Sequence, residues 1–226
     1  MSKIKNQAPF ECYHIFNRGM QKQPIFESNK DRLRFLFLLL AFQGSNIIPN
    51  VSRTLKQFVQ SSTLNISRDF VNEISKDKKI ELMSFCLMPN HFHLIVYEKT
   101  EGGIAKYMQR VLTAYTKYFN TKYKKSGHLF QSSYKSVHIR NNNQLLYLST
   151  YIHRNPREFS EWKNKEHLFP WSSYQDYINK NRWRGLLSRD LILDQFLDQK
   201  KGYNEFVKTS GAKELEENLD EEFLVK

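Results

Sequence analysis

Two histidines separated by one residue, His91 and His93, open an apolar segment that predicts a β-strand. Successive side chains on a strand point to opposite faces, so both imidazoles should lie on one face and Phe92 on the other. Neutral imidazole is a common ligand of divalent metals, and two of them on one strand leave positions open for a substrate. The same pattern also describes two half-buried histidines beside a turn, so the pair alone leaves both interpretations open.

A second candidate group lies in a predicted helix at 144–155, where Tyr147, Tyr151 and Asn155 recur every four residues and share one face. If that face meets the histidines, a tyrosine hydroxyl and an amide oxygen reach the same place. An amide oxygen is a suitable ligand for Mg²⁺ or Mn²⁺, and a tyrosine beside a metal-bound phosphate is a candidate nucleophile. The alternative is that both tyrosines belong to the core and that Asn155 caps the helix.

Elements that would position these residues follow one another as strand, helix, two strands, helix, strand and helix. This order predicts an α+β fold, a ferredoxin-like antiparallel sheet with helices packed on one face. The polar segment at about 44–79 predicts a helical insertion. We expect residues 1–180 to form the core and residues 181–226 to form a helical extension with an acidic tail. The expected segments of the core are 10–16, 33–42, 80–87, 91–97, 104–123, 129–139 and 144–155.

The charge of the chain favours a polyanionic partner. Lysine and arginine outnumber aspartate and glutamate by 35 to 23, for a net charge of +12. Acidic residues are concentrated at the end, where residues 213–226 hold six acids and two lysines. An excess of this size favours nucleic acid over acidic lipid, although a basic surface can also serve solubility alone.

The cysteines and the apolar runs indicate a cytoplasmic protein with no membrane partner. Cys12 and Cys86 lie in strand-like contexts without a zinc-finger spacing, so we expect buried, reduced thiols. The apolar runs are too short to cross a bilayer, and the N-terminus lacks the apolar stretch of a signal peptide.

Several short motifs occur in an order that resembles the single-tyrosine HUH transposases, the IS200-like family, and within it the transposases associated with repetitive extragenic palindromes (REP). The resemblance runs from residue 13 to about residue 206. It rests on Met88-Pro89-Asn90-His91-Phe92-His93-Leu94, Tyr115-Thr116-Lys117-Tyr118-Phe119-Asn120, Gly127-His128-Leu129-Phe130-Gln131, Tyr151-Ile152 with Asn155-Pro156, and Trp171-Ser172-Ser173-Tyr174.

The resemblance implies a metal-dependent enzyme that nicks and rejoins single-stranded or hairpin DNA. His91, His93 and Asn155 would bind the divalent metal, Mg²⁺ or Mn²⁺. Tyr151 would attack a DNA phosphate and leave a 5′-phosphotyrosine and a free 3′-hydroxyl, whereas Tyr147 lacks the motif that follows Tyr151. Relatives exist that work as dimers with shared active sites, so a homodimer is compatible with the resemblance.

Residues in and near these motifs are candidates for contacts with DNA, although each one by itself also fits an ordinary surface or core role. Ser133 departs from the family, many of whose members carry an arginine there. A competing function is a non-catalytic nucleic-acid-binding module, since RNA-recognition domains share the ferredoxin-like layout, but their aromatic strand signature is absent. The candidates for DNA contacts are Arg18, Arg110, Lys117, Gln131, Tyr134, Lys135, Arg140 and Arg154.

Overall fold

The computed structural model describes residues 11–45, 51–61 and 66–211. Within these ranges the chain forms a four-stranded sheet of order β2-β3-β1-β4, and every neighbouring pair is antiparallel. This is the ferredoxin-like order, in which a helical crossover separates β1 from β2 and the next strand fits between them. The predicted α+β class is confirmed. The strands are β1 (Glu11–Arg18), β2 (Ile80–Met88), β3 (His91–Glu98) and β4 (Lys135–Ile139).

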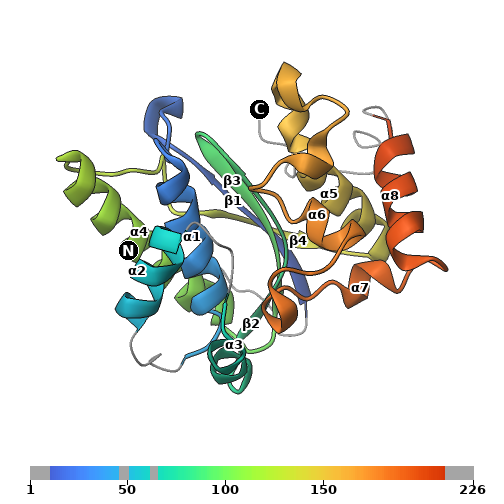
Figure 1. The fold of residues 1–226 in the computed structure, drawn as a ribbon, viewed down its shortest axis with the longest axis horizontal. Helices are drawn as coiled ribbons and strands as arrows, with labels where there is room; N and C mark the ends of the chain where they lie inside the picture. The colour runs from blue at the N-terminus through green and yellow to red at the C-terminus, as the bar shows by residue number, and fades with distance from the viewer. Residues whose placement is uncertain (1–10, 46–50, 62–65, 212–226) are drawn as a thin grey trace.

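Two long helices, α1 (Asn29–Ala41) and α4 (Gly103–Tyr123), cover one face of the sheet (Figure 1). Phe92 points from β3 into this layer, and its ring lies 5.1 Å from the ring of Phe35 on α1. Because neighbouring side chains of a strand alternate, His91 and His93 must point to the other face.

The predicted helical insertion is confirmed by α2 (Val51–Ser61) and α3 (Arg68–Ser75). The rings of Phe58 and Phe70 lie 5.4 Å and 5.5 Å from the ring of Phe37 on α1. The insertion therefore extends the core outward from α1, on the side of the sheet away from the histidines.

Helix α5 (Asn142–Arg154) lies on the opposite face of the sheet from α1 and α4 (Figure 1). The expectation of helices on one face therefore describes α1 and α4 only. The physical reason is that the histidine face of the sheet also carries apolar side chains, such as the fully buried Ile95, which need a cover. Helix α5 supplies that cover with its own buried residues, Leu148 and Ile152.

The predicted C-terminal helical extension is present, and it follows a segment that closes one edge of the sheet. The amide of Leu87 donates to the carbonyl of Trp171 at 2.9 Å, and the amide of Ser173 donates to the carbonyl of Phe85 at 3.0 Å. The backbone of β2 is thereby paired where it would otherwise form an open edge. The helices from this point on are α6 (Tyr174–Ile178), η5 (Arg184–Leu186), α7 (Asp190–Leu193) and α8 (Gln199–Thr209).

The expected acidic tail, 213–226, lies outside the described residues. Among the helices that are described, none combines the length and the apolar character needed to cross a bilayer.

Candidate metal and nucleophile site

The two histidines lie at the start of β3, on the face covered by α5. His91 pairs with Arg18 across the sheet and His93 pairs with Phe16, so both imidazoles share one face as the alternation predicts. Their ring centroids are 5.1 Å apart, with the ring planes nearly perpendicular. Both side chains are buried, with 2% of His91 and none of His93 exposed.

The protonation of His91 is set by its neighbour Asn90. Nδ1 of His91 lies 2.7 Å from Oδ1 of Asn90, and Nδ2 of Asn90 donates to the carbonyl of Lys22 at 3.1 Å. The second bond assigns the orientation of the Asn90 amide, so its oxygen accepts and Nδ1 of His91 donates. Burial lowers the pKa of His91 to about 4, so the ring is neutral near pH 7. Its Nε2 therefore presents a lone pair.

That lone pair faces another acceptor. Oδ1 of Asn155 lies 3.4 Å from Nε2 of His91, while Nδ2 of Asn155 donates to the carbonyl of Tyr151 at 3.0 Å. Asn155 is also the C-cap of α5, as the simpler interpretation expected. Two acceptor atoms turned toward each other in a buried place repel, and a cation between them converts the repulsion into attraction. This arrangement fits a metal site.

His93 contributes a further buried ring nitrogen. Its Nδ1 lies 2.9 Å from Nε2 of His14. Its Nε2 is buried and has no hydrogen-bond partner among the described residues. Burial, together with the neighbouring His91 and His14, holds the pKa of His93 well below its usual value, so this ring is neutral too. Burying a ring nitrogen without a partner lowers the stability of the fold unless a ligand binds to it.

Tyr151 lies against these histidines, and Tyr147 does not. The ring of Tyr151 is 5.5 Å from the ring of His93 and perpendicular to it. The ring of Tyr147 lies 5.3 Å from Phe206 of α8. One turn of helix α5 therefore separates a tyrosine at the site from a tyrosine that packs on the C-terminal extension.

The donor set consists of two imidazole nitrogens and one amide oxygen. The described residues hold no cluster of three or more histidine, cysteine, aspartate or glutamate side chains suited to a metal. A mixed set of nitrogen and oxygen donors suits divalent ions and leaves coordination positions for phosphate oxygens.

Two of the predicted DNA contacts, Arg18 and Lys135, lie on the face of the sheet that carries the histidines. Arg18 is opposite His91 on the same face. Lys135 pairs with Phe16 and places its ammonium 5.6 Å from that ring. Arg154 precedes Asn155, and one nitrogen of its guanidinium is buried without a hydrogen-bond partner among the described residues.

A fourth candidate, Gln131, is held beside Arg18, because its amide donates to the Arg18 carbonyl at 3.0 Å. Tyr134 and Arg140 flank β4, the first half-buried and the second exposed. Arg140 uses its backbone amide to bind Oε1 of Gln144 at 2.9 Å.

The structure does not bring Arg110 to this site. Its guanidinium lies 4.4 Å from the ring of Phe42 and donates to the carbonyl of Gly44, on the α4 side of the sheet. Lys117 is exposed on the same helix. These two basic residues are therefore separated from the histidines by the sheet.

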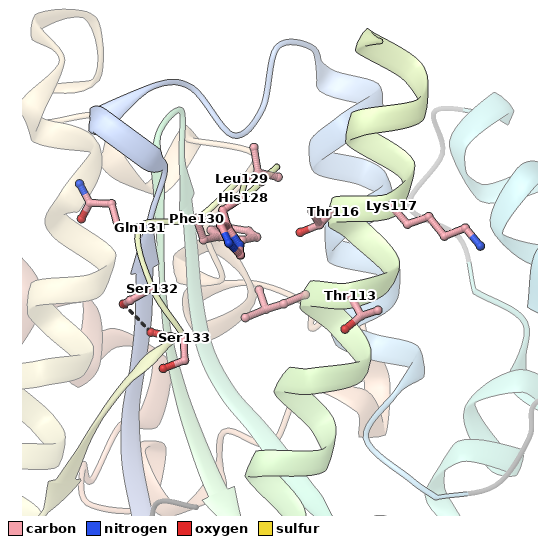
Figure 2. Close-up of a pocket in the computed structure, with 10 residues that line it drawn as sticks. Thr113, Thr116, Lys117, His128, Leu129, Phe130, Gln131, Ser132 and Ser133 are labelled. Atoms are coloured by element: carbon pink, nitrogen blue, oxygen red, sulfur yellow. Dashed lines mark hydrogen bonds between the residues drawn. The ribbon is translucent and has the colours of Figure 1, made fainter. Parts of the chain in front are cut away.

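A pocket of about 640 Å³ lies between α4 and the segment that precedes β4. Figure 2 shows His128 and Phe130 facing α4, while the Lys117 side chain extends away from them. Nδ2 of Asn17 donates to the carbonyl of Ser132 at 3.0 Å and holds the pocket wall to β1. Sequence reasoning did not predict this pocket, because its walls come from segments without a common pattern. Its other lining residues are Leu112, Thr113, Thr116, Leu129, Gln131, Ser132 and Ser133.

Sequence reasoning also missed His14, which is fully buried against His93. Alternation along the first strand places His14 on the same face as Phe16. The register of β1 on β3, which only the folded sheet shows, brings it to His93.

Two comparisons with known proteins found similarities. Residues 50–155 match the family described as "Transposase IS200 like", and that range includes His91, His93, Tyr151 and Asn155. A solved structure titled "Structure of the REP associates tyrosine transposase bound to a REP hairpin" is similar with a TM-score of 0.50 and 13% identity. The similarity covers 88% of this chain and 97% of that one, and it supports the fold. The search of curated proteins finds no match.

Proposed function

We propose that the protein nicks and rejoins single-stranded or hairpin DNA, because residues 50–155 match the IS200-like transposase family. The observation that carries the proposal is the buried approach of Nε2 of His91 to Oδ1 of Asn155, with the unpartnered Nε2 of His93 and the ring of Tyr151 beside them.

His91, His93 and Asn155 would hold Mg²⁺ or Mn²⁺. When bound, the ion supplies neutralisation of the phosphate charge and polarisation of a phosphate oxygen. Arg18 and Lys135 lie on the histidine face of the sheet, and Arg154 precedes Asn155 on α5. These cations would bind neighbouring phosphates along the strand.

Tyr151 would act as the nucleophile. Its phenolic oxygen attacks the phosphorus of one phosphodiester, the bond from phosphorus to the 3′-oxygen breaks, and the phenolic proton is released to solvent or to a nearby base. The leaving 3′-oxygen takes up a proton and becomes a 3′-hydroxyl. The product is a 5′-phosphotyrosine, which preserves the energy of the phosphodiester, so attack by another 3′-hydroxyl rejoins DNA and frees Tyr151.

Two observations favour DNA as the partner. The net charge is +12, and two cations, Arg18 and Lys135, lie on the histidine face of the sheet. The structurally similar transposase is described in complex with a REP hairpin. Hairpin DNA is therefore the substrate to test first.

The deciding experiment uses 3′-end-labelled hairpin DNA with single-stranded flanks, incubated with the full-length protein and Mn²⁺ and resolved on a denaturing gel. We expect a covalent protein–DNA adduct with the wild type and with Tyr147→Phe, and none with Tyr151→Phe. Tyr147→Phe is the matched control, because it makes the same change one helical turn away. Loss of the adduct in Tyr147→Phe alone would overturn the assignment. A wild type that binds hairpins without forming an adduct would favour the non-catalytic binding module.

A further inference from the structure

His14 is a buried histidine that the proposed reaction does not use directly. It lies on β1, the strand between β3 and β4, and pairs with Ile95 on one side and Val137 on the other. None of its side chain is exposed. Its Nε2 lies 2.9 Å from Nδ1 of His93, and the two ring planes are within 15° of parallel. The sheet therefore holds this nitrogen in one place against the proposed metal ligand.

One hydrogen joins the two rings, and its position decides what the far side of His93 presents. If Nδ1 of His93 donates to His14, Nε2 of His93 carries a lone pair. If His14 donates instead, Nε2 of His93 carries a hydrogen and has no lone pair for a metal. Only the first arrangement produces a metal ligand.

We infer that His14 is a positioning residue that accepts a hydrogen bond from Nδ1 of His93 and so holds Nε2 of His93 ready to bind the divalent ion. This inference rests on the proposed function. The other proposed ligand, His91, has the same kind of partner. Asn90 accepts a hydrogen bond from Nδ1 of His91, and Nε2 of His91 faces Asn155. Each histidine of the pair thus has its own acceptor, one from the preceding residue and one from the neighbouring strand. Such outer partners fix the tautomer and the ring orientation of metal-binding histidines.

Two variants separate the hydrogen bond from the packing. His14→Phe keeps a planar ring in the same space and removes the acceptor. His14→Gln offers an amide oxygen that can accept from Nδ1 of His93. We expect the affinity for Mn²⁺, measured by the electron paramagnetic resonance signal of free Mn²⁺, to fall about 10- to 100-fold in His14→Phe. His14→Gln should stay close to the wild type.

The tautomer itself is the second readout, and it needs neither metal nor a variant of His14. Long-range ¹H–¹⁵N spectra distinguish a protonated ring nitrogen from one with a lone pair, and the signals of His93 are assigned by their loss in His93→Gln. In the metal-free wild type we expect the hydrogen of His93 on Nδ1.

Outcomes of the two measurements separate the inference from the function on which it rests. A hydrogen on Nε2 of His93 in the wild type, or an unchanged Mn²⁺ affinity in a folded His14→Phe, would overturn the role of His14 and leave the metal site standing. A wild type that binds no Mn²⁺ would overturn the metal site, and the role of His14 with it.

Discussion

Another buried histidine, His153 on α5, should make the stability of the protein sensitive to acid. Its ring is fully buried, with Nδ1 2.6 Å from the hydroxyl of Tyr203 and Nε2 2.8 Å from Oγ of Ser173. Burial lowers its pKa from 6.5 to about 3. Between these two pH values the imidazole is protonated in the unfolded chain and neutral in the folded chain. The free energy of unfolding is therefore highest above pH 6.5 and falls as the pH drops below that value.

The size of the effect follows from the two pKa values. A pH of 5 is 1.5 units below the pKa of the imidazole in the unfolded chain, and each unit changes the free energy of unfolding by about 1.4 kcal/mol. His153 alone should therefore cost the folded state about 2 kcal/mol between pH 7 and pH 5. His14, whose burial lowers its pKa to about 3 as well, should add a similar amount.

The variant His153→Phe isolates the contribution of His153 to the pH dependence of stability. The phenyl ring can keep the stacking on Tyr174, which lies 5.3 Å from the imidazole. The hydroxyl of Tyr203 retains Ser149 as a partner at 3.0 Å, and Oγ of Ser173 still accepts from the amide of Phe85 at 2.9 Å. We therefore expect a loss of about 1–2 kcal/mol at pH 7 from the two broken hydrogen bonds.

Urea unfolding at pH 7, 6 and 5 tests the prediction. His153→Phe should lose about 2 kcal/mol less than the wild type on going from pH 7 to pH 5. His128→Phe, at an exposed position, serves as the control and should follow the wild type. Parallel curves for His153→Phe and the wild type would refute the reasoning.

Three further substitutions test the proposed site and the core. Asn155→Leu removes the amide oxygen and should weaken Mn²⁺ binding about tenfold or more while Asn155→Asp retains it, as measured by calorimetry; equal affinities would remove Asn155 from the ligand set. Gly19→Ala should lower the free energy of unfolding by about 2 kcal/mol or more, because a Cβ there would lie 2.1 Å from the carbonyl oxygen of Gln23, and an unchanged melting temperature would contradict this. Asp31→Asn should cost about 2–4 kcal/mol in urea unfolding, and a neutral effect would show that the buried carboxylate contributes nothing. Burial opposes ionisation of Asp31, but its pKa is held below the usual value by hydrogen bonds from Lys122, Tyr123, Tyr118 and Ser28.

Local patterns predicted much of the fold because they follow from short-range chemistry. Alternation along the strand put His91 and His93 on one face, and the order of strands and helices indicated the ferredoxin-like sheet. Four-residue spacing predicted that Tyr147, Tyr151 and Asn155 share a helix face. The inferences about the strand and the helix need only the geometry of one element, and the inference about the sheet needs only the order of the elements along the chain.

The tertiary structure alone decided which residues meet at the candidate site, because that depends on how separate elements pack. The spacing on α5 could not say which tyrosine meets the histidines, because that depends on how the helix lies between the sheet and α8. From the sequence, Arg110 and Arg18 were equivalent candidates for DNA contacts. The structure places them on opposite faces of the sheet, and charge alone does not indicate on which face a residue lies. His14 reached His93 through strand register, a relation between residues 79 positions apart that no local pattern contains.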